Sequence, residues 1–387
     1  MNTPLKISIV EPSGGLYGSE LALLDILERL ETSAFQTEVI LPRHASFGER
    51  LQKKGVASRA LLWPKAHTQS RLKKLFSYFC LARLWLRQRP DLIYINQGGI
   101  LRPVASIAER LRIPILCQVQ TLEDARWISG LKRQHELVST FVCNSEYISS
   151  HCSVPKDRLT TLYYGYNPKD LRPPCRPSYQ SNGPFEVGLL GRICENKGHF
   201  FVIEAVRLLK QSSLHQFHFR FIGSPDDPKE GIRIESLVKQ HGLTEWIEFR
   251  GYRRDIAAEF AQLHLLVIPS VAEPFGRIFC ETAEAQTPAL LADAGGLGEL
   301  SRRFDAGVRF TPGDVKDFVG QLRRISTNYE TTRRDFELAS ERMLNALDFT
   351  TYLSVMKDLL ARAATGNPVS VKWLGGEAKN VGKVFNA

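Results

Sequence analysis

Short apolar runs alternate along the chain with longer segments in which apolar residues recur every three or four positions. The runs predict buried strands, and the longer segments predict helices that cover a sheet. In the first half, strands are expected at 6–10, 37–41, 56–63, 91–96, 113–119 and 141–143 and from 159, and helices after Ser19 and at 47–54, 69–90 and 101–111. This alternation favours an α/β fold built on a doubly wound parallel sheet.

The same alternation starts again after residue 184. The stretch 167–184 is rich in Pro and Ser and has no periodicity, which is typical of an interdomain linker. Beyond it, strands are expected at 185–190, 217–222, 247–249 and 265–268, and helices at 199–211, 232–241, 255–263, 277–285, 316–326, 335–347 and 350–363. We therefore expect two similar domains, 1–170 and 185–348, joined by a linker at 171–184. The tail 365–387 shows weak periodicity and receives no assignment.

Composition and charge narrow the functional classes. With 387 residues, of which 43% are hydrophobic and 24% charged, the chain is long enough for two cores. No apolar run reaches the roughly 18 residues that span a bilayer, and no signal peptide is visible. The seven cysteines include no C-x-x-C pair, so a cytoplasmic location is expected. The net charge of +10 indicates an acidic partner, such as a nucleic acid, an anionic lipid or a phosphorylated substrate.

The stretch 264–300 carries the strongest candidate site. Its apolar run at 265–268 predicts a buried strand, and a helix is expected soon after it. The candidate residues in the intervening loop and the helix are Glu273, Phe275, Gly276 and Glu281. Ligands of parallel sheets bind beyond the carboxyl ends of the strands, where the N–H groups of helix starts attract anions. The two glutamates are either ligand contacts or only partners of the helix dipole.

A second pair of charged residues follows the strand expected at 185–190. Arg192 and Lys197 lie five positions apart, between Gly191 and Gly198. A guanidinium fork together with an ammonium group neutralises a diphosphate well. The pair alone also fits an ordinary surface loop, but its place after a strand favours a ligand site.

A glycine-rich turn follows the first strand. Residues 11–19 read Glu-Pro-Ser-Gly-Gly-Leu-Tyr-Gly-Ser, and Ser19 can cap the helix that begins there. A strand, a glycine-rich turn and a helix can form a ligand-facing site. The turn is neither G-x-G-x-x-G nor a P-loop, and a plain tight turn fits it as well.

Together these segments resemble the retaining GT-B glycosyltransferases, in particular family GT4. The segment from Glu273 to Glu281 is similar to the family's E-x7-E motif. Gly191 to Gly198 resembles its G-R-x-x-x-x-K-G motif, and the turn at Gly14-Gly15 with Glu20 resembles its Gly-Gly-x-x-x-x-E loop. The resemblance covers nearly the whole chain. It implies two facing Rossmann-like doubly wound domains with an interdomain cleft, and a helix at about 350–364 that crosses back onto the first domain.

The resemblance also implies a reaction. A retaining enzyme of this kind moves a sugar from a UDP-sugar or GDP-sugar to a glycan or lipid-linked acceptor, without a cofactor or metal, often in bacterial envelope or exopolysaccharide synthesis. Arg192 and Lys197 would stabilise the leaving diphosphate, and Glu281 would bind the ribose. Glu273 would hold the transferred sugar, so Glu273, Arg192 and Lys197 are the implied catalytic residues. The other implied donor contacts are Gly15, Tyr252 near the base, and the amides of Phe275 and Gly276.

One segment departs from the family pattern. Many members carry a histidine after the strand expected at 113–119, where it contacts the transferred sugar. This chain has Gln120 there, and glutamine can donate a hydrogen bond but cannot titrate. We expect Gln120 and Glu20 to contact the sugar or the acceptor.

Residues 69–90 combine apolar and basic side chains without an acidic one. Their apolar positions, among them Leu75, Phe76 and Phe79, recur at helical spacing, and the basic residues are Arg71, Lys73, Lys74, Arg83, Arg87 and Arg89. Such a helix can lie on an anionic membrane, with Phe76, Phe79 and Trp85 as anchors where the core does not use them. The enzyme would then be peripheral on the inner face of the cell membrane. Alternatively, the apolar stripe covers the sheet and the basic residues are merely solvated.

Three other classes stay open. They are a catalytically silent GT-B scaffold, a basic nucleic-acid-binding protein, and a GT-B epimerase or phosphorylase. No helix-turn-helix, RNP or zinc pattern supports nucleic-acid binding, and no pyridoxal-phosphate lysine motif is evident. The charged residues at both candidate motifs are intact, which argues against a silent scaffold.

Overall fold

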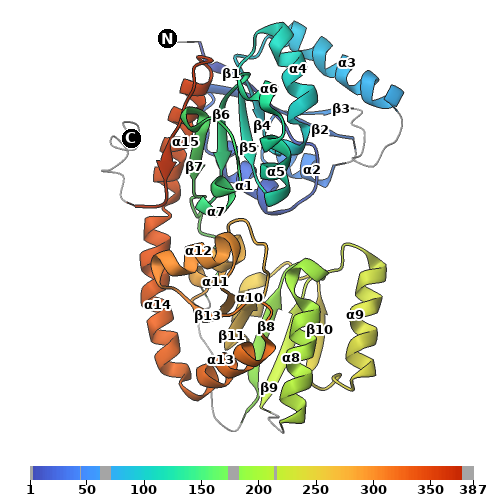
Figure 1. Ribbon diagram of the computed structural model, residues 1–387, viewed down its shortest axis with the longest axis vertical. Helices are drawn as coiled ribbons and strands as arrows, with labels where there is room; N and C mark the ends of the chain where they lie inside the picture. Colours follow the sequence, from blue (N-terminus) through green and yellow to red (C-terminus); the bar gives the residue numbers. More distant parts are fainter. Residues whose placement is uncertain (1–2, 44, 62–70, 173–182, 213–215, 377–387) are drawn as a thin grey trace. The chain divides into compact units, whose positions relative to one another are not determined.

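The computed structural model describes residues 3–43, 45–61, 71–172, 183–212 and 216–376, and for 71–74 the backbone alone. The chain divides into two compact units: unit 1 contains 1–167 and 347–387, and unit 2 contains 168–346 (Figure 1). Most of the expected linker, 173–182, and the end of the tail, 377–387, lie outside the described residues.

Unit 1 is built on an eight-stranded sheet in the order β14-β7-β6-β5-β4-β1-β2-β3. Every neighbouring pair is parallel. The strands are β1 (Leu5–Val10), β2 (Phe35–Pro42), β3 (Ser58–Leu61), β4 (Leu92–Ile95), β5 (Ile115–Val119), β6 (Val138–Cys143), β7 (Leu159–Leu162) and β14 (Lys372–Trp373). The order along the chain reverses between β1 and β4, and ligands of doubly wound sheets bind at such a reversal.

Helices cover this sheet, as the apolar periodicity predicts. They are α1 (Gly18–Leu27), α2 (Ser46–Lys53), α3 (Arg71–Gln88), α4 (Leu101–Leu111), α5 (Leu122–Ser129), α6 (Lys132–His135), α7 (Glu146–Ser150) and α15 (Phe349–Ala363), with short 3-10 turns at Gly98–Ile100 and Lys156–Arg158. The start of α15 is fixed by Asp348, whose carboxylate accepts from the Thr351 amide at 2.7 Å. Gly165 allows the chain after β7 to approach this helix, because a Cβ at Gly165 would lie 2.4 Å from Cβ of Tyr352.

Helix α3 gives only part of its surface to the core. Leu81 and Trp85 are fully buried, and the Trp85 indole donates to Oγ of Ser8 at 2.8 Å. Trp85 is therefore used by the core, and of the three expected anchors it is the one that cannot serve on a membrane. Phe76 and Phe79 are instead 54% and 62% exposed. The idea that the whole apolar stripe covers the sheet is therefore wrong, because α3 leaves large apolar side chains in solvent.

Strand β14 lies in the tail that received no assignment. It pairs in parallel with β7, through Lys372 opposite Thr161 and Trp373 opposite Leu162. Val369, Val371 and Trp373 are buried at alternate positions, which is the period of a strand with one covered face. This short alternation completes the edge of the unit 1 sheet.

Unit 2 contains a six-stranded parallel sheet in the order β10-β9-β8-β11-β12-β13. Its strands are β8 (Phe185–Leu190), β9 (Phe217–Ile222), β10 (Ile247–Gly251), β11 (Leu265–Ile268), β12 (Ala289–Ala292) and β13 (Val308–Phe310). The order reverses between β8 and β11, which are hydrogen-bonded neighbours. The two parallel sheets confirm the expected α/β fold with two Rossmann-like domains.

The helices of unit 2 are α8 (His199–Gln211), α9 (Pro228–Gln240), α10 (Ile256–Phe260), α11 (Arg277–Glu284), α12 (Gly295–Phe304), α13 (Val315–Thr327) and α14 (Tyr329–Ala346), and a 3-10 turn spans Glu195–Lys197. Helix α9 begins four residues before the expected start of 232. Asp227 caps it and Pro228 occupies its first turn, which is a sequence signal for a helix start. Phe219 and Phe221 of β9 lie in a core that α8, α9 and α13 cover.

Candidate functional site in unit 2

The predicted charged residues of unit 2 follow the two strands at which its sheet order reverses. Arg192 and Lys197 follow β8, and Glu273 follows β11. A Cβ added to Gly198 would lie 2.7 Å from Cγ of Pro269, so the two loops touch. Ligands of doubly wound sheets bind outside the carboxyl ends of strands at this position.

The loop after β8 is held by backbone contacts. Gly191 and Gly198 have φ values of +143° and +78°, a region that glycine enters without strain. The Ile193 amide donates to Ser224 O at 3.0 Å. His199, the first residue of α8, is fully buried, and burial lowers its pKa to about 4, so it is a neutral packing residue at physiological pH.

An ion pair connects the two loops. Nζ of Lys197 lies 2.7 Å from Oε2 of Glu273, and both side chains are largely buried. The carbonyl of Glu273 accepts from the Gly296 amide at 2.9 Å. A Cβ at Gly296 would lie 1.9 Å from the carbonyl oxygen of Pro274, so the start of α12 has room against this loop only because residue 296 is glycine.

Helix α11 begins at Arg277, four residues after Glu273. Gly276 precedes the helix with a φ of +100°, and Phe275 is buried. Glu281, in the second turn, forms an ion pair with Nζ of Lys169 through Oε1. Lys169 was not a candidate in the sequence, because its contact with Glu281 joins residues 112 positions apart.

Arg192 forms an ion pair with Asp226, in the loop between β9 and α9. The two side chains are 46% and 41% exposed. An ion pair this exposed contributes at most about 1 kcal/mol. An anionic ligand can therefore displace Asp226 from Arg192 at little cost.

Tyr252 follows β10 and is 69% exposed. Arg250 and Arg253, which lie before and after it in the sequence, both contact Glu259 of α10. Arg250 reaches both carboxylate oxygens of Glu259, at 3.3 and 3.2 Å, and Nε of Arg253 lies 3.2 Å from Oε1. The turn that presents Tyr252 is thus fixed from both sides.

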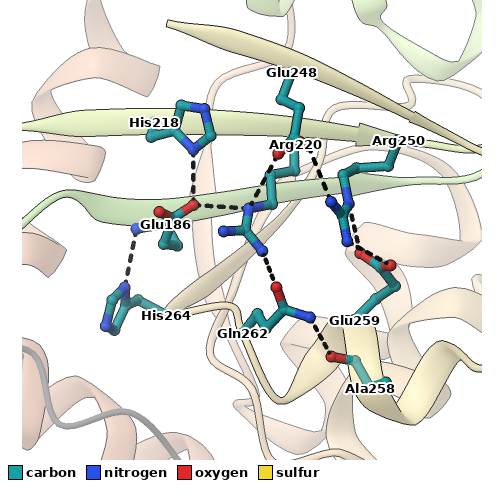
Figure 2. A network of polar contacts seen from close by, with 9 residues as sticks. All are labelled: Glu186, His218, Arg220, Glu248, Arg250, Ala258, Glu259, Gln262 and His264. Atoms are coloured by element: carbon teal, nitrogen blue, oxygen red, sulfur yellow. Dashed lines mark hydrogen bonds and ion pairs between the residues drawn. The ribbon is translucent and has the colours of Figure 1, made fainter.

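Figure 2 shows that this anchor belongs to a wider polar network across β8, β9 and β10. Glu186 lies between Nδ1 of His218 and Nε of Arg220, each at 2.9 Å. Arg220 also donates to Oε1 of Gln262 at 2.7 Å. The alternating polar residues of β9 and β10 form this charged face, opposite the aromatic face that packs against α8 and α9.

In unit 1, a polar cluster lies where β1 and β4 end. Glu11 and Glu20 are fully buried, and the amide of Gln97 donates to both carboxylates at 3.2 Å. Asn96 donates to Glu11 at 2.6 Å. Burial and the neighbouring Glu20 carboxylate raise the pKa of Glu11 to about 7, although hydrogen bonds from Asn96 and Ser13 oppose this rise.

Glu20 has local partners rather than solvent. Its carboxylate accepts from the Tyr17 amide at 3.2 Å, from Oγ of Ser19 at 2.8 Å and from Oγ of Ser13. The Gly15 amide donates to Oγ of Ser13 at 3.2 Å. These contacts shape the glycine-rich turn, and direct contacts of Gly15 or Glu20 with a substrate stay predictions.

Gln120 is also buried. Its Nε2 donates to Asn96 O at 3.1 Å, and its Oε1 accepts from the Tyr164 hydroxyl and from Asn144. Both ends of the side-chain amide are therefore engaged within unit 1. The predicted contact of Gln120 with a sugar stays a prediction.

In the described part of the chain, no group of three or more His, Cys, Asp or Glu side chains is arranged to hold a metal ion. No helix among those residues has the length and apolar character needed to cross a bilayer.

Comparisons with known proteins point to one enzyme family. Residues 176–342 match the family model of glycosyl transferases group 1, and residues 18–148 match that of the glycosyl transferase 4-like domain. Glycogen synthase of Mycobacterium tuberculosis is 26% identical over 316 residues, which span 76% of this chain and 73% of that protein. The 2-deoxystreptamine glucosyltransferase of Streptomyces kanamyceticus is 30% identical over 148 residues, which span 38% of this chain and 37% of that protein.

Solved structures share the fold. Anabaena Alr3699/HepE, crystallised with UDP and glucose, superposes with a TM-score of 0.77 at 20% identity, covering 92% of this chain and 99% of that one. Sucrose-phosphate synthase from Thermosynechococcus elongatus gives a TM-score of 0.74 at 16% identity, with 94% and 100% covered.

Proposed function

Because the chain belongs to the group 1 glycosyltransferases and has their GT-B fold, we propose that it transfers a sugar from a UDP-sugar or GDP-sugar with retention of configuration. The acceptor is a glycan or a lipid-linked saccharide of bacterial envelope or exopolysaccharide synthesis. The reaction needs no divalent metal, because Arg192 and Lys197 supply the positive charge for the leaving diphosphate.

The observation that carries this proposal is the convergence of charged groups at the strand reversal of unit 2. Arg192 and Lys197 follow β8, next to the loop of Glu273 after β11. Negative charge develops on the diphosphate as the sugar–oxygen bond breaks, so cations placed there stabilise the transition state more than the ground state. The acceptor hydroxyl attacks on the same face, and a donor phosphate oxygen takes its proton.

The remaining site residues bind the ends of the donor. Glu281 receives the ribose hydroxyls, Glu273 holds hydroxyls of the transferred sugar, and the amides of Phe275 and Gly276 contact sugar or phosphate. Tyr252 lies next to the base. On donor binding, the diphosphate replaces Asp226 as the partner of Arg192, and Lys197 is shared between Glu273 and phosphate.

A donor-hydrolysis assay with a panel of UDP-sugars and GDP-sugars tests the proposal. The Anabaena protein was also crystallised with UDP-glucose, which makes this donor the first to try. We expect slow release of UDP or GDP from one donor, and loss of that release in Lys197→Ala. Lys239→Ala, on the exposed side of α9, is the matched control. Nucleotide binding without hydrolysis or transfer would favour the silent scaffold.

For the location of the enzyme, we propose that α3 binds an anionic membrane surface from one side. Leu75, Phe76, Phe79 and Leu86 are between 54% and 65% exposed. Arg83 and Arg87 are exposed on the same helix. Large apolar side chains with arginines beside them fit the interface of an anionic bilayer, where each basic residue adds up to about 1 kcal/mol.

Co-sedimentation with liposomes of increasing anionic lipid content tests this surface. The wild type should sediment at low salt and be released at high salt, because salt screens the charge term. Phe76→Ser/Phe79→Ser should stay in the supernatant, whereas Ile232→Ser, which removes a similarly exposed side chain of α9, should behave as wild type. Wild type that stays in the supernatant at low salt would overturn the membrane proposal and favour an acidic soluble acceptor.

A further inference from the structure

Lys169 is a charged residue beside the proposed nucleotide site that no motif includes. It is the second residue of unit 2, and its ammonium group pairs with Oε1 of Glu281. Neither side chain is fully in solvent, since Lys169 is 32% and Glu281 20% exposed. In the proposed function, Glu281 binds the ribose hydroxyls of the donor.

The backbone around Lys169 is held against the same helix. The Lys169 amide donates to both oxygens of Glu284, at 2.9 and 3.1 Å, and the Asp170 amide donates to Oε1 of Glu284 at 3.0 Å. Asp170 has a φ of +57°, a conformation that costs a non-glycine residue energy and persists where its surroundings hold it. Residues 169 and 170 thus form a strap, fixed to α11 by Glu284 and carrying the Lys169 side chain to Glu281.

The two carboxylates of the E-x7-E segment are paired in the same way. One carboxylate oxygen of Glu273 accepts from Nζ of Lys197, and one carboxylate oxygen of Glu281 accepts from Nζ of Lys169. Within the described part of the chain, the donor that Glu281 contacts is at Oε1, and Oε2 has no donor there. An ammonium group that holds one carboxylate oxygen restricts the rotation of the group, and the other oxygen is left to accept from a ligand.

We propose that Lys169 is a positioning residue of the nucleotide site, which orients Glu281 so that Oε2 accepts from the ribose hydroxyls of the donor. This inference rests on the proposed function, because it takes Glu281 as the ribose contact. Lys169 does not touch the ligand itself. Its loss leaves Glu281 in place but lets the carboxylate rotate, so binding energy is lost only with ligands that have ribose hydroxyls.

The test compares ligands with and without those hydroxyls. Affinities of UDP and GDP and of their 2′,3′-dideoxy forms are measured by isothermal titration for wild type, Lys169→Met, Lys169→Arg, Glu281→Gln and the double variant Lys169→Met/Glu281→Gln. Lys169→Met retains the backbone amide that binds Glu284, so the strap and the fold are kept. Lys54→Met is the matched control, since Lys54 pairs with Glu28 at 3.0 Å in unit 1.

For the nucleotide that binds, wild type should prefer the ribose form by about tenfold, the size expected of a hydrogen bond to a charged group. Lys169→Met should reduce this preference about threefold or more and leave the affinity of the dideoxy form unchanged. Lys169→Arg should restore most of it, and Lys169→Met should have no further effect when Glu281 is already glutamine. Lys54→Met should match wild type.

Three results would overturn the inference. An equal loss of affinity for both forms would mean that Lys169 acts on the diphosphate by its charge. An unchanged preference would make Lys169–Glu281 an ordinary surface ion pair, and a further loss in the Glu281→Gln background would mean that Lys169 contacts the ligand directly. If wild type binds neither UDP nor GDP, the nucleotide site itself is wrong, and the role of Lys169 falls with it.

Discussion

Replacing Glu11 by glutamine should make the stability of the protein less dependent on pH. Glu11 is fully buried at the end of β1, and its carboxylate accepts from the Ser13 amide at 2.7 Å and from Asn96 at 2.6 Å. Its hydrogen-bond partners among the described residues include no cation, and the second buried carboxylate, Glu20, shares the Gln97 amide with it. Burial and Glu20 together raise the pKa of Glu11 from 4.5 to about 7.

The direction of the effect follows from the raised pKa. The folded state binds the proton of Glu11 more tightly than the unfolded state does, so this residue's contribution to stability is complete below pH 4.5 and is lost as the pH rises through about 7. The difference in pKa corresponds to about 3 kcal/mol. Glutamine resembles the protonated acid and cannot ionise, so the variant does not lose this contribution.

Urea unfolding followed by tryptophan fluorescence, at intervals from pH 4 to pH 9, measures the effect. Trp85, buried in unit 1, reports on the affected unit. The free energy of unfolding of Glu11→Gln relative to wild type should rise by about 3 kcal/mol from the acid to the alkaline end. Glu49→Gln, on the exposed side of α2, should give a flat difference. Parallel curves for wild type and Glu11→Gln would show that Glu11 ionises normally and would refute the reasoning.

Other expected outcomes concern the site and its loops. Glu281→Ala should mainly weaken nucleotide binding and Glu273→Ala mainly lower kcat, because the sugar contact tightens as charge develops; steady-state kinetics would reveal the reverse pattern if the two roles were exchanged. Turnover should survive EDTA, and a loss that Mg²⁺ restores would contradict the proposed metal independence. Gly296→Ala should lower thermal stability and activity, because its Cβ would lie 1.9 Å from Pro274 O, whereas Gly320→Ala, with nothing within 4 Å in helix α13, should be neutral or stabilise by up to about 1 kcal/mol.

Sequence reasoning succeeded where burial alone determines the structure. The runs 185–190, 217–222 and 265–268 coincide with β8, β9 and β11, because a strand covered on both faces needs an almost continuous apolar run, and a strand with one polar face needs a strong alternation. The positions of Arg192, Lys197 and Glu273 at strand ends followed from those runs. Predicting that these residues contact one another would also have required the order of the strands in the sheet.

The sequence was weaker where the surroundings of a residue decide its role. Strand β14 rests on three alternating buried residues, Val369, Val371 and Trp373, too few to separate from chance. Helix α3 has the apolar stripe of a sheet cover, yet the neighbours needed to cover Phe76 and Phe79 are absent among the described residues. In the sequence, Glu11 is an ordinary polar residue at the end of a strand, and only the packed structure shows that its carboxylate has no access to solvent.

Lys169 illustrates a third limit. Nothing in its local sequence distinguishes it from other lysines near a linker. Its proposed role rests on Glu284, which fixes the backbone at residues 169 and 170, and on Glu281 one turn earlier on α11. A contact between charged residues this far apart in the sequence leaves no pattern of periodicity or spacing that could predict it.

The central claim is that the strand reversal of unit 2 binds the diphosphate of a nucleotide sugar. Isothermal titration of UDP and GDP into wild type, Arg192→Ala and Lys197→Ala tests it most directly. One nucleotide should bind the wild type, and each variant should lose on the order of 2 kcal/mol or more of binding free energy, since each removes a charge-assisted contact to phosphate. Unchanged affinity in both variants would place the nucleotide elsewhere and contradict the account.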